Sequence, residues 1–229
     1  MVDFEILAQH IIDGHADDVS RMTQQAVDEG HGPAEILEKG LIAGMTVVGI
    51  RFRDNIIFVP EVLISARAMK AGMAVLEPIL TACGIPPVGK VVMGTVKGDI
   101  HDIGKNLVGM MLKGAGFQVH DLGVNVNLAK FQAAIEQHQP DLLGMSALLT
   151  TTMGQMKVNI EAFDKAGLFK RMRVMVGGAP VSEEYARATG AHGYGKDAAS
   201  AVELAMKLID ELKMARENNA GPLINADSR

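Results

Sequence analysis

Cysteine, tryptophan and excess positive charge are scarce or absent in this chain of 229 residues. The single cysteine, Cys83, excludes an internal disulfide and any zinc or iron–sulfur site built from several cysteines. There is no tryptophan and there are only two tyrosines, so an aromatic platform for single-stranded nucleic acid is not expected. Lys and Arg number 22 against 27 Asp and Glu, and this net charge of −5 argues against binding to a phosphate backbone.

Long apolar runs are also missing. No run reaches the roughly 18 residues of a membrane-spanning helix, and the opening MVDFEILAQH lacks the pattern of a secretory signal. We therefore expect a cytoplasmic protein with neither a membrane nor a nucleic acid as partner. Hydrophobic residues make up 48% of the chain and charged residues 21%, which is typical of a folded globular protein.

The first part of the chain has helical periodicity. Phe4, Leu7, Ala8 and Ile11 follow the i, i+3, i+4, i+7 spacing of an amphipathic helix. Three further apolar stripes fall within residues 19–27, 36–48 and 59–80. Four helices of this length predict a small helical bundle, which we assign to residues 1–88.

Residues 84–89 are predicted to be a linker, because they contain two glycines and two prolines. Beyond it, β-rich runs alternate with helical stretches, and a final helix is expected at 197–217. The runs predicted as strands are 90–96, 117–123, 141–147 and 173–178. This alternation predicts an α/β domain with a doubly wound, Rossmann-like parallel sheet over residues 89–217, followed by a loose tail at 218–229.

In a doubly wound sheet, ligands bind at the carboxyl ends of the strands. The loops 97–104, 146–152 and 177–180 are therefore the candidate site. The first loop has a glycine at each end, as a phosphate-binding loop would. Such a loop requires four residues between its glycines and Ser or Thr after its lysine, whereas here there are five, and Asn106 follows Lys105. A dinucleotide fingerprint is missing as well, so both nucleotide interpretations fail.

The same loop contains D-x-H-x-x-G, with Asp99 two residues before His101. A metal-bound imidazole usually donates its second ring N–H to a carboxylate, which fixes the tautomer and raises the basicity of the ligand. In the alternative interpretation, Asp99 caps the following helix and His101 is a solvated loop residue. These residues alone leave both interpretations open.

With its neighbours included, the loop resembles a known family. TVKGDIHDIGKNLVGMMLKGAGFQVHDLGVNV is similar to the signature of the cobalamin-binding domain that takes its cofactor with the lower base displaced. The resemblance implies that His101 is the lower axial cobalt ligand and that Asp99 hydrogen-bonds to it. Further residues that it places at the cofactor are Gly98, Ile100, Asp102 and Gly104.

The resemblance continues through MSALLTTT, VGGAP and YGKDA. The residues that it places along the displaced nucleotide tail are Ser146, Thr150, Gly177, Gly178 and Ala198. Thr152 stands where methionine synthase has a serine that continues the Asp–His relay, so the hydroxyl is kept and the residue type differs. Asp99 and Thr152 are accordingly the expected proton reservoir behind the ligand.

The helical half resembles the four-helix cap of methionine synthase and of the small methanogen and acetogen corrinoid proteins, through VVGIRFRDNIIFVPEVLISARAMKAGMAVLEPIL. It implies that the bundle covers the upper face of the cobalt and swings away at the 84–89 linker. Candidates for the contact with that face are Phe58, Val59, Val62 and Leu63. The alternative is that these four residues are simply core of the bundle.

The resemblance implies a corrinoid protein that carries a methyl group on cobalt between a substrate-specific methyltransferase and an acceptor methyltransferase. The bound corrinoid is expected in methyl and aquo forms, and a reductive activase is a further expected partner. Methylamines, methanol, methoxylated aromatics and betaines are the expected donors. The alternatives are a cobalamin-dependent sensor or storage protein and the cobalamin subunit of a mutase. No independent substrate site is evident in the sequence.

The remaining histidines and the cysteine are not assigned to the site. Cys83 is interpreted as structural or incidental, and His120 and Asp121 as surface residues. The histidines that show no ligand spacing and are expected to be solvated are His10, His15, His31, His138 and His192.

Overall fold

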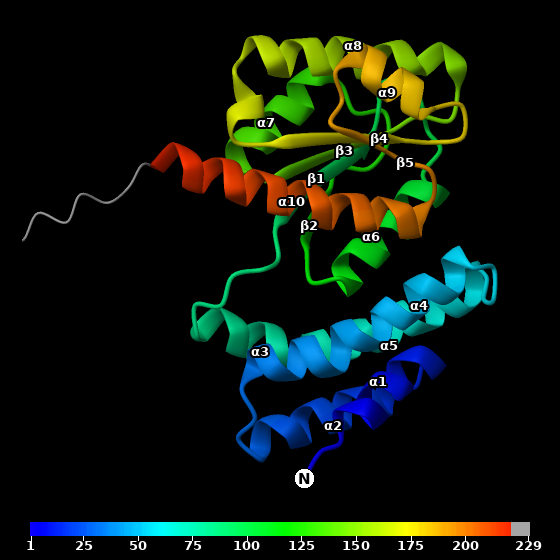
Figure 1. Ribbon diagram of the computed structural model, residues 1–229. Helices are drawn as coiled ribbons and strands as arrows, with labels where there is room; N and C mark the ends of the chain where they lie inside the picture. Colours follow the sequence, from blue (N-terminus) through cyan, green and yellow to red (C-terminus); the bar gives the residue numbers. More distant parts are fainter. Residues whose placement is uncertain (221–229) are drawn as a thin grey trace, which may run out of the picture.

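The protein, described by a computed structural model over residues 1–220, consists of a helical bundle and a sheet domain (Figure 1). The predicted fold class, a helical cap followed by a parallel α/β domain, is thereby confirmed. The last helix was expected to end at 217 and continues to Ala220, while the rest of the predicted tail lies outside the described residues. None of the helices within residues 1–220 is long and apolar enough to cross a membrane.

The bundle contains the four predicted helices, the third of which is a continuous run of three segments. Its elements are α1 (Phe4–Asp13), α2 (Ala16–Asp28), α3 (Pro33–Glu35), the π-helical η1 (Ile36–Ile42), α4 (Ala43–Arg53) and α5 (Val59–Ala82). The apolar stripes meet in one core, in which Leu7, Leu41 and Leu76 are fully buried. Helix α5 begins at Val59, so Pro60 lies in its first turn. Proline is well tolerated there, because the first N–H groups of a helix have no partner within the helix.

The sheet domain has five parallel strands in the order β2-β1-β3-β4-β5. Its elements are β1 (Lys90–Thr95), α6 (Ile103–Gly114), β2 (Gln118–Asp121), α7 (Leu128–His138), β3 (Leu142–Ser146), α8 (Thr150–Lys165), the 3-10 turn η2 (Leu168–Lys170), β4 (Arg173–Gly177), α9 (Glu183–Thr189), β5 (Gly193–Gly195) and α10 (Ala198–Ala220). Strand β5 was not predicted, because three residues reading Gly-Tyr-Gly carry no apolar run.

Helices cover both faces of the sheet, with α7, α8 and α9 on one side and α6 and α10 on the other (Figure 1). Successive side chains of a strand point to opposite faces of the sheet. Val92 packs in the core with α7 and α8, and Val91 packs in the core with α6 and α10. Burial on both faces explains why the strands read as nearly continuous apolar runs.

The strand order reverses at β1, since β2 lies on one side of it and β3 on the other. The loops that follow β1 and β3 therefore leave in opposite directions. At such a switch point the carboxyl edge of the sheet has a crevice in which ligands bind. Residues 96–102 and 147–149 border this crevice.

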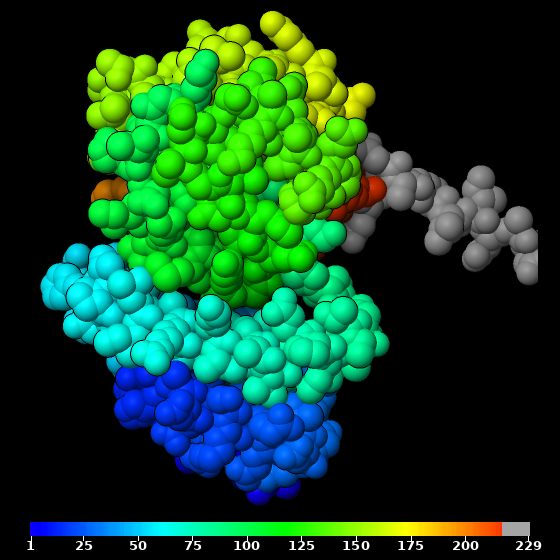
Figure 2. Space-filling view, turned by 180° about the vertical axis from the view of Figure 1, so that it is seen from behind, coloured from blue at the N-terminus to red at the C-terminus, as the bar shows by residue number. Residues whose placement is uncertain are grey.

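Helices α4 and α5 of the bundle pack on α6 and α10 of the sheet domain, and we call this contact the cap interface (Figures 1 and 2). Two of its contacts pair methionine with glycine: a Cβ on Gly114 would lie 2.7 Å from Cε of Met45, and one on Gly49 would lie 3.6 Å from Cε of Met111. At its border, Arg53 Nη1 lies 2.7 Å from Glu203 Oε1. The chain crosses between the two halves once, from Ala82 to Lys90.

His192, which was expected to be solvated, is instead packed beside β4. Its Nδ1 accepts a hydrogen bond from the backbone N–H of Val174 (3.0 Å), and its ring meets Phe169 edge-on, with centroids 4.6 Å apart. Burial, together with the positive charge of Arg173, lowers the pKa of His192 to about 4. The expectation for His192 was therefore wrong.

This buried imidazole predicts a loss of stability in mild acid. An unfolded histidine takes up a proton near pH 6.5, whereas the folded one resists it until about pH 4. The neutral ring of His192 therefore contributes fully to the free energy of unfolding above pH 6.5. As the pH falls from 6.5 toward 4, this free energy decreases by about 1–2 kcal/mol, after allowance for the partial exposure of the ring. Urea unfolding at neutral pH and at about pH 4.5 measures the loss. His192→Asn keeps an acceptor for Val174 and should flatten this dependence; equal slopes in both proteins would contradict the assignment.

Candidate functional site

A buried carboxylate occupies the crevice at the switch point. Asp99 is 0% exposed, and its Oδ1 accepts from the backbone N–H of His101 (3.0 Å) and lies 2.8 Å from the ring Nδ1 of His101. Its Oδ2 accepts from the N–H groups of Leu148 (2.8 Å) and Leu149 (3.1 Å) and from the hydroxyl of Thr152 (2.8 Å). One side chain thus joins the loop after β1 to the loop after β3.

The carboxylate of Asp99 remains ionised at neutral pH. Burial by itself would raise the pKa of Asp99, but the donors from His101, Leu148 and Thr152 outweigh burial and hold this pKa well below its usual range. Asp99 is therefore a fixed negative charge behind the ring of His101. That Asp99 and Thr152 act as a proton reservoir stays a prediction.

The ring of His101 is oriented with one nitrogen free. Because Nδ1 donates to Asp99, the neutral ring carries its proton there and leaves the lone pair on Nε2. The side chain is 45% exposed, and the hydroxyl of Thr95 fixes its backbone by donating to the carbonyl of His101 (2.9 Å). A neutral imidazole with a buried carboxylate behind it is well suited to bind a metal through Nε2.

Thr152 can donate in two directions. Its Oγ1 lies 2.8 Å from Asp99 Oδ2 and 2.8 Å from the carbonyl oxygen of Leu149. A hydroxyl has a single proton, so it donates to one of these acceptors at a time. It can therefore strengthen or weaken its support of the carboxylate without moving.

Asn125, which was not predicted as a site residue, fixes the loop that carries Asp99 and His101. The N–H of Gly98, at φ +85°, donates to Oδ1 of Asn125 (2.8 Å), and the N–H of Asn125 donates to the carbonyl of Asp99 (2.9 Å). The positive φ favours glycine at position 98. Gly98 therefore shapes the loop and does not line the cavity beside it.

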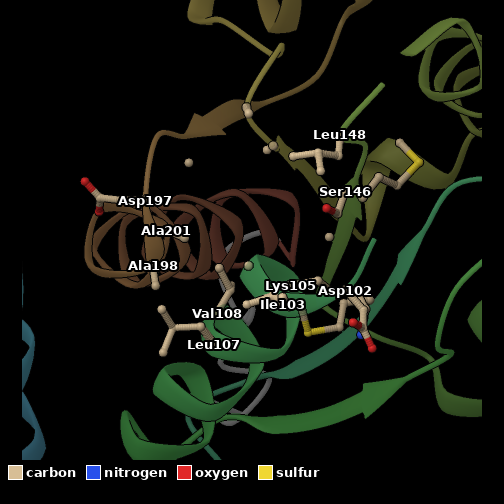
Figure 3. A pocket seen from close by; sticks show the side chains of 18 of the residues that line it. Asp102, Ile103, Lys105, Leu107, Val108, Ser146, Leu148, Asp197, Ala198 and Ala201 are labelled. Atoms are coloured by element: carbon tan, nitrogen blue, oxygen red, sulfur yellow. The ribbon is translucent and has the colours of Figure 1, made fainter. Parts of the chain in front are cut away.

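A cavity of about 630 Å³ opens beside His101 (Figure 3). It lies between the ends of the strands and the helices α6 and α10. Figure 3 shows Ser146 and Leu148 on one wall and Val108, Ala198 and Ala201 on another, around the same space. Further small residues on its walls are Gly104, Gly144, Gly177, Gly178 and Gly195. A slot lined in this way is wide enough for a long, thin group.

The site fits the corrinoid that the resemblance implies. A Cβ on Gly104 would meet nothing within 4 Å, so this glycine leaves open space beside His101. Ile100 and Ile103 at the rim are 73% and 81% exposed, which provides an apolar edge for a flat ring. The cavity behind them, with Ser146 on its wall, has the volume and the small lining residues that a nucleotide tail would need.

Most of the residues assigned to the cofactor surround this cavity. Those on its wall are Ile100, His101, Asp102, Gly104, Ser146, Gly177, Gly178 and Ala198. Asp99 and Thr152 lie behind His101. Thr150 is not part of the wall: it is exposed as the first residue of α8. The sequence pattern predicts a helical stretch near 153–167, but α8 begins three residues earlier, because its three threonines have low helix propensity and hid its start.

A buried lysine on the cavity wall was not recognised from the sequence. The side chain of Lys105 is 1% exposed, and its ammonium bonds to the carboxylate of Asp121 and to Oδ1 of Asn106 (2.7 Å). Asn106 in turn donates to Oδ2 of Asp102 (2.9 Å). Asp121 was expected only as a surface residue. Its position at the carboxyl end of a strand was the signal in the sequence that could have placed it near the site. This network fixes the first turn of α6 beside His101.

The candidate cap residues divide into two groups. Val62 is fully buried in the bundle, so the core interpretation holds for it. Phe58, Val59 and Leu63 are 61%, 37% and 41% exposed, and their contact with an upper face stays a prediction. The bundle contributes Phe52 to the lining of the cavity.

Comparison with known proteins assigns both halves of the chain. Residues 89–203 match a B12 binding domain, and residues 4–77 match a second family of the same description. A corrinoid protein of Desulfitobacterium hafniense (strain Y51) is 43% identical over 206 residues, covering 89% of this chain and 95% of that protein. Dimethylamine corrinoid protein 3 of Methanosarcina acetivorans is 40% identical over 212 residues, covering 91% of this chain and all of that protein.

Solved structures agree with these matches. The methanol:cobalamin methyltransferase complex MtaBC of Methanosarcina barkeri contains a chain that is 31% identical, with a TM-score of 0.79 over 93% of this chain and 82% of that one. A cobalamin-binding protein of D. hafniense DCB-2 is 27% identical, with a TM-score of 0.76 over 91% of this chain and 99% of that one. With the Asp99–His101 pair, the small-residue cavity and both family matches in place, the chain belongs to the B12-binding corrinoid proteins, and its cofactor is a corrinoid.

Proposed function

We propose that this corrinoid protein carries a methyl group from a methyltransferase that acts on a methylated amine to a second, acceptor methyltransferase. When bound, the corrinoid supplies the cobalt ion that holds the methyl group. The observation that carries the proposal is the 2.8 Å contact between Nδ1 of His101 and the ionised Asp99, with Nε2 left free at an open edge. The names of its relatives, among them dimethylamine and trimethylamine corrinoid proteins, favour the amine as donor.

In this proposal, Nε2 of His101 has two alternative uses. In the loaded protein it would hold the cobalt as a neutral ligand, and when not ligated it would be able to hold a proton. The buried charge of Asp99 stabilises the second form and increases the basicity of the first. Thr152 adjusts the balance, because its hydroxyl can donate to Asp99 or turn to the carbonyl of Leu149.

Both methyltransferases must reach the same edge of the sheet domain in turn. Ile100, Ile103 and Leu148 are exposed there and offer an apolar surface. We assign residues 1–88 to the cap and 89–217 to the corrinoid domain, with 84–89 as the hinge. When the cap moves over that edge, Phe58, Val59 and Leu63 are the candidates to cover the upper face. A reductive activase as third partner and a cytoplasmic location belong to the same proposal.

The Asp99→Asn variant tests the role of the pair. An amide at this position would direct its NH2 group toward N–H donors, so we expect methyl transfer to be slower, by about 10–100-fold. The assay loads the chain with hydroxocobalamin and follows methylation of the corrinoid, by visible absorbance, with dimethylamine and its methyltransferase under reducing conditions.

Asp164→Asn is the matched control, because Asp164 is an exposed residue of α8 in the same domain and does not line the cavity. It should transfer the methyl group at nearly the normal rate. Equal rates in wild type and Asp99→Asn would contradict the role of the pair. A wild-type chain that binds adenosylated corrinoid and exchanges no methyl group with any methyltransferase would contradict the carrier function itself.

A further inference from the structure

Three metal-ligating side chains converge at the corner between α1 and α2, away from the corrinoid site. They are His10 in the last turn of α1, His15 before α2 and Asp18 in its first turn. Their ligand atoms lie within 4.8 Å of one another, and the Nδ1 atoms of the two histidines are 3.2 Å apart. No other set of three such groups was found among residues 1–220. His15 follows His10 by five residues and Asp18 follows His15 by three, and this spacing predicted no metal site. The turn between the two helices brings the three side chains together.

The corner is built rigidly. Gly14 has φ +76°, and behind it the N–H of His15 donates to the carbonyl of His10 (2.9 Å), which closes the end of α1 and places the two histidines side by side. Helix α5 holds the turn from the other side. A Cβ on Gly14 would lie 2.0 Å from Cγ2 of Ile64, and the hydroxyl of Ser65 donates to the carbonyl of Ile12 (3.1 Å).

The orientation of the rings suits a shared ion. His15 is the N-cap residue of α2, yet its side chain makes no capping hydrogen bond and lies beside His10. The two Nδ1 atoms lie at hydrogen-bond distance, 3.2 Å, and this spacing is close to the about 3.3–3.4 Å between two nitrogens bound to one tetrahedral zinc ion. The rings are tilted by 51° with centroids 5.4 Å apart, so nitrogen atoms and not ring faces approach each other.

Asp18 completes the set. Nη2 of Arg21 binds its Oδ1 at 2.7 Å, which leaves Oδ2 as the oxygen for a metal. Two imidazoles and one carboxylate, with a fourth position for water, make a typical open site for a borderline divalent cation. We propose that His10, His15 and Asp18 form a zinc(II) site that joins the end of α1 to the start of α2 and stabilises the cap.

The test is a zinc titration of the corrinoid-free protein by calorimetry, slightly above neutral pH. A Cys83→Ser background removes the exposed thiol as a competing ligand. We expect wild type to bind one more zinc ion per chain than His15→Ala and Asp18→Asn. Zinc should also raise the Tm of wild type but not of these variants, because the ion binds the folded state.

The second histidine pair of the chain provides a matched control. His120 and His138 are stacked face to face, with centroids 3.8 Å apart and an angle of 18°, so their nitrogens do not converge in the same way. His138→Gln should bind zinc as wild type does. Arg21→Ala frees both oxygens of Asp18 and should bind zinc more tightly. Circular dichroism checks that each variant is folded. The same zinc stoichiometry and affinity in wild type, His15→Ala and Asp18→Asn would overturn the proposal, as would the absence of any binding.

Discussion

Replacing His101 by alanine will abolish nitrogen ligation of the bound corrinoid. Nε2 of His101 is the exposed ring nitrogen on the wall of the cavity, and Asp99 fixes the ring in that orientation. We expect the visible spectrum after loading with hydroxocobalamin and desalting to change from a histidine-ligated form to one without a lower nitrogen ligand. Removing even a supporting group of a metal ligand costs about 10–100-fold in affinity, so loss of the ligand itself should reduce retention at least as much.

His120→Ala is a suitable control, because it removes an imidazole from the same domain without touching the cavity lining. It should retain the corrinoid with an unchanged spectrum. If His101→Ala kept a histidine-ligated spectrum, the ligand would have to be another residue, and the assignment of the site would be wrong. If wild type itself retained no corrinoid, the carrier function would be wrong as well.

Two glycines of the cavity wall should respond to alanine in opposite ways. Gly178 has φ +123°, and a Cβ there would lie 1.9 Å from the carbonyl oxygen of Ala147. Gly178→Ala should therefore destabilise the fold by on the order of 3 kcal/mol, from strain and overpacking together. A Cβ on Gly104, in the first turn of α6, meets nothing. Gly104→Ala should leave the free energy of unfolding equal or raise it by about 0.5–1 kcal/mol, because alanine favours a helix.

The measurements are urea unfolding of the corrinoid-free variants and retention of hydroxocobalamin by those that fold. We expect Gly104→Ala to be stable but to bind the corrinoid less well, since its methyl group would occupy space left for the ring. This variant separates the two causes of weak binding, because it changes the site without changing stability. Normal retention by Gly104→Ala would show that the corrinoid does not approach this glycine.

The sequence predicted well those features that depend on short separations. The resemblance that includes the D-x-H motif implied the hydrogen bond between Asp99 and His101, and the structure contains it. A two-residue separation lets the side chain reach back whatever the rest of the fold does. The helical stripes and apolar strand runs are equally local, and four of the five strands were located from them. Strand β5 escaped because tertiary contacts, and not its own residues, make it a strand.

Features that depend on strand order were not accessible in this way. Lys105 and Asp121 meet because β2 lies beside β1, and the position of Asp121 at the carboxyl end of a strand does not by itself reveal that its partner is a buried lysine. Asn125 supports Gly98 for the same reason. His10 and His15 illustrate a third case: a left-handed glycine between two helices reverses the chain, so residues without ligand spacing become neighbours.

The cap interface has a thermodynamic consequence. Methionine against glycine makes contacts that are non-directional, and a flexible thioether can follow a moving neighbour without leaving a void. Small rotations of the two halves therefore break few specific interactions, and the Arg53–Glu203 pair, at an exposed position, adds little to hold one orientation. Such tolerance of small rotations is what the proposed movement of the cap at residues 84–89 requires. If the cap moves in this way, each binding partner shifts the population of closed and open arrangements in proportion to its preference for one of them.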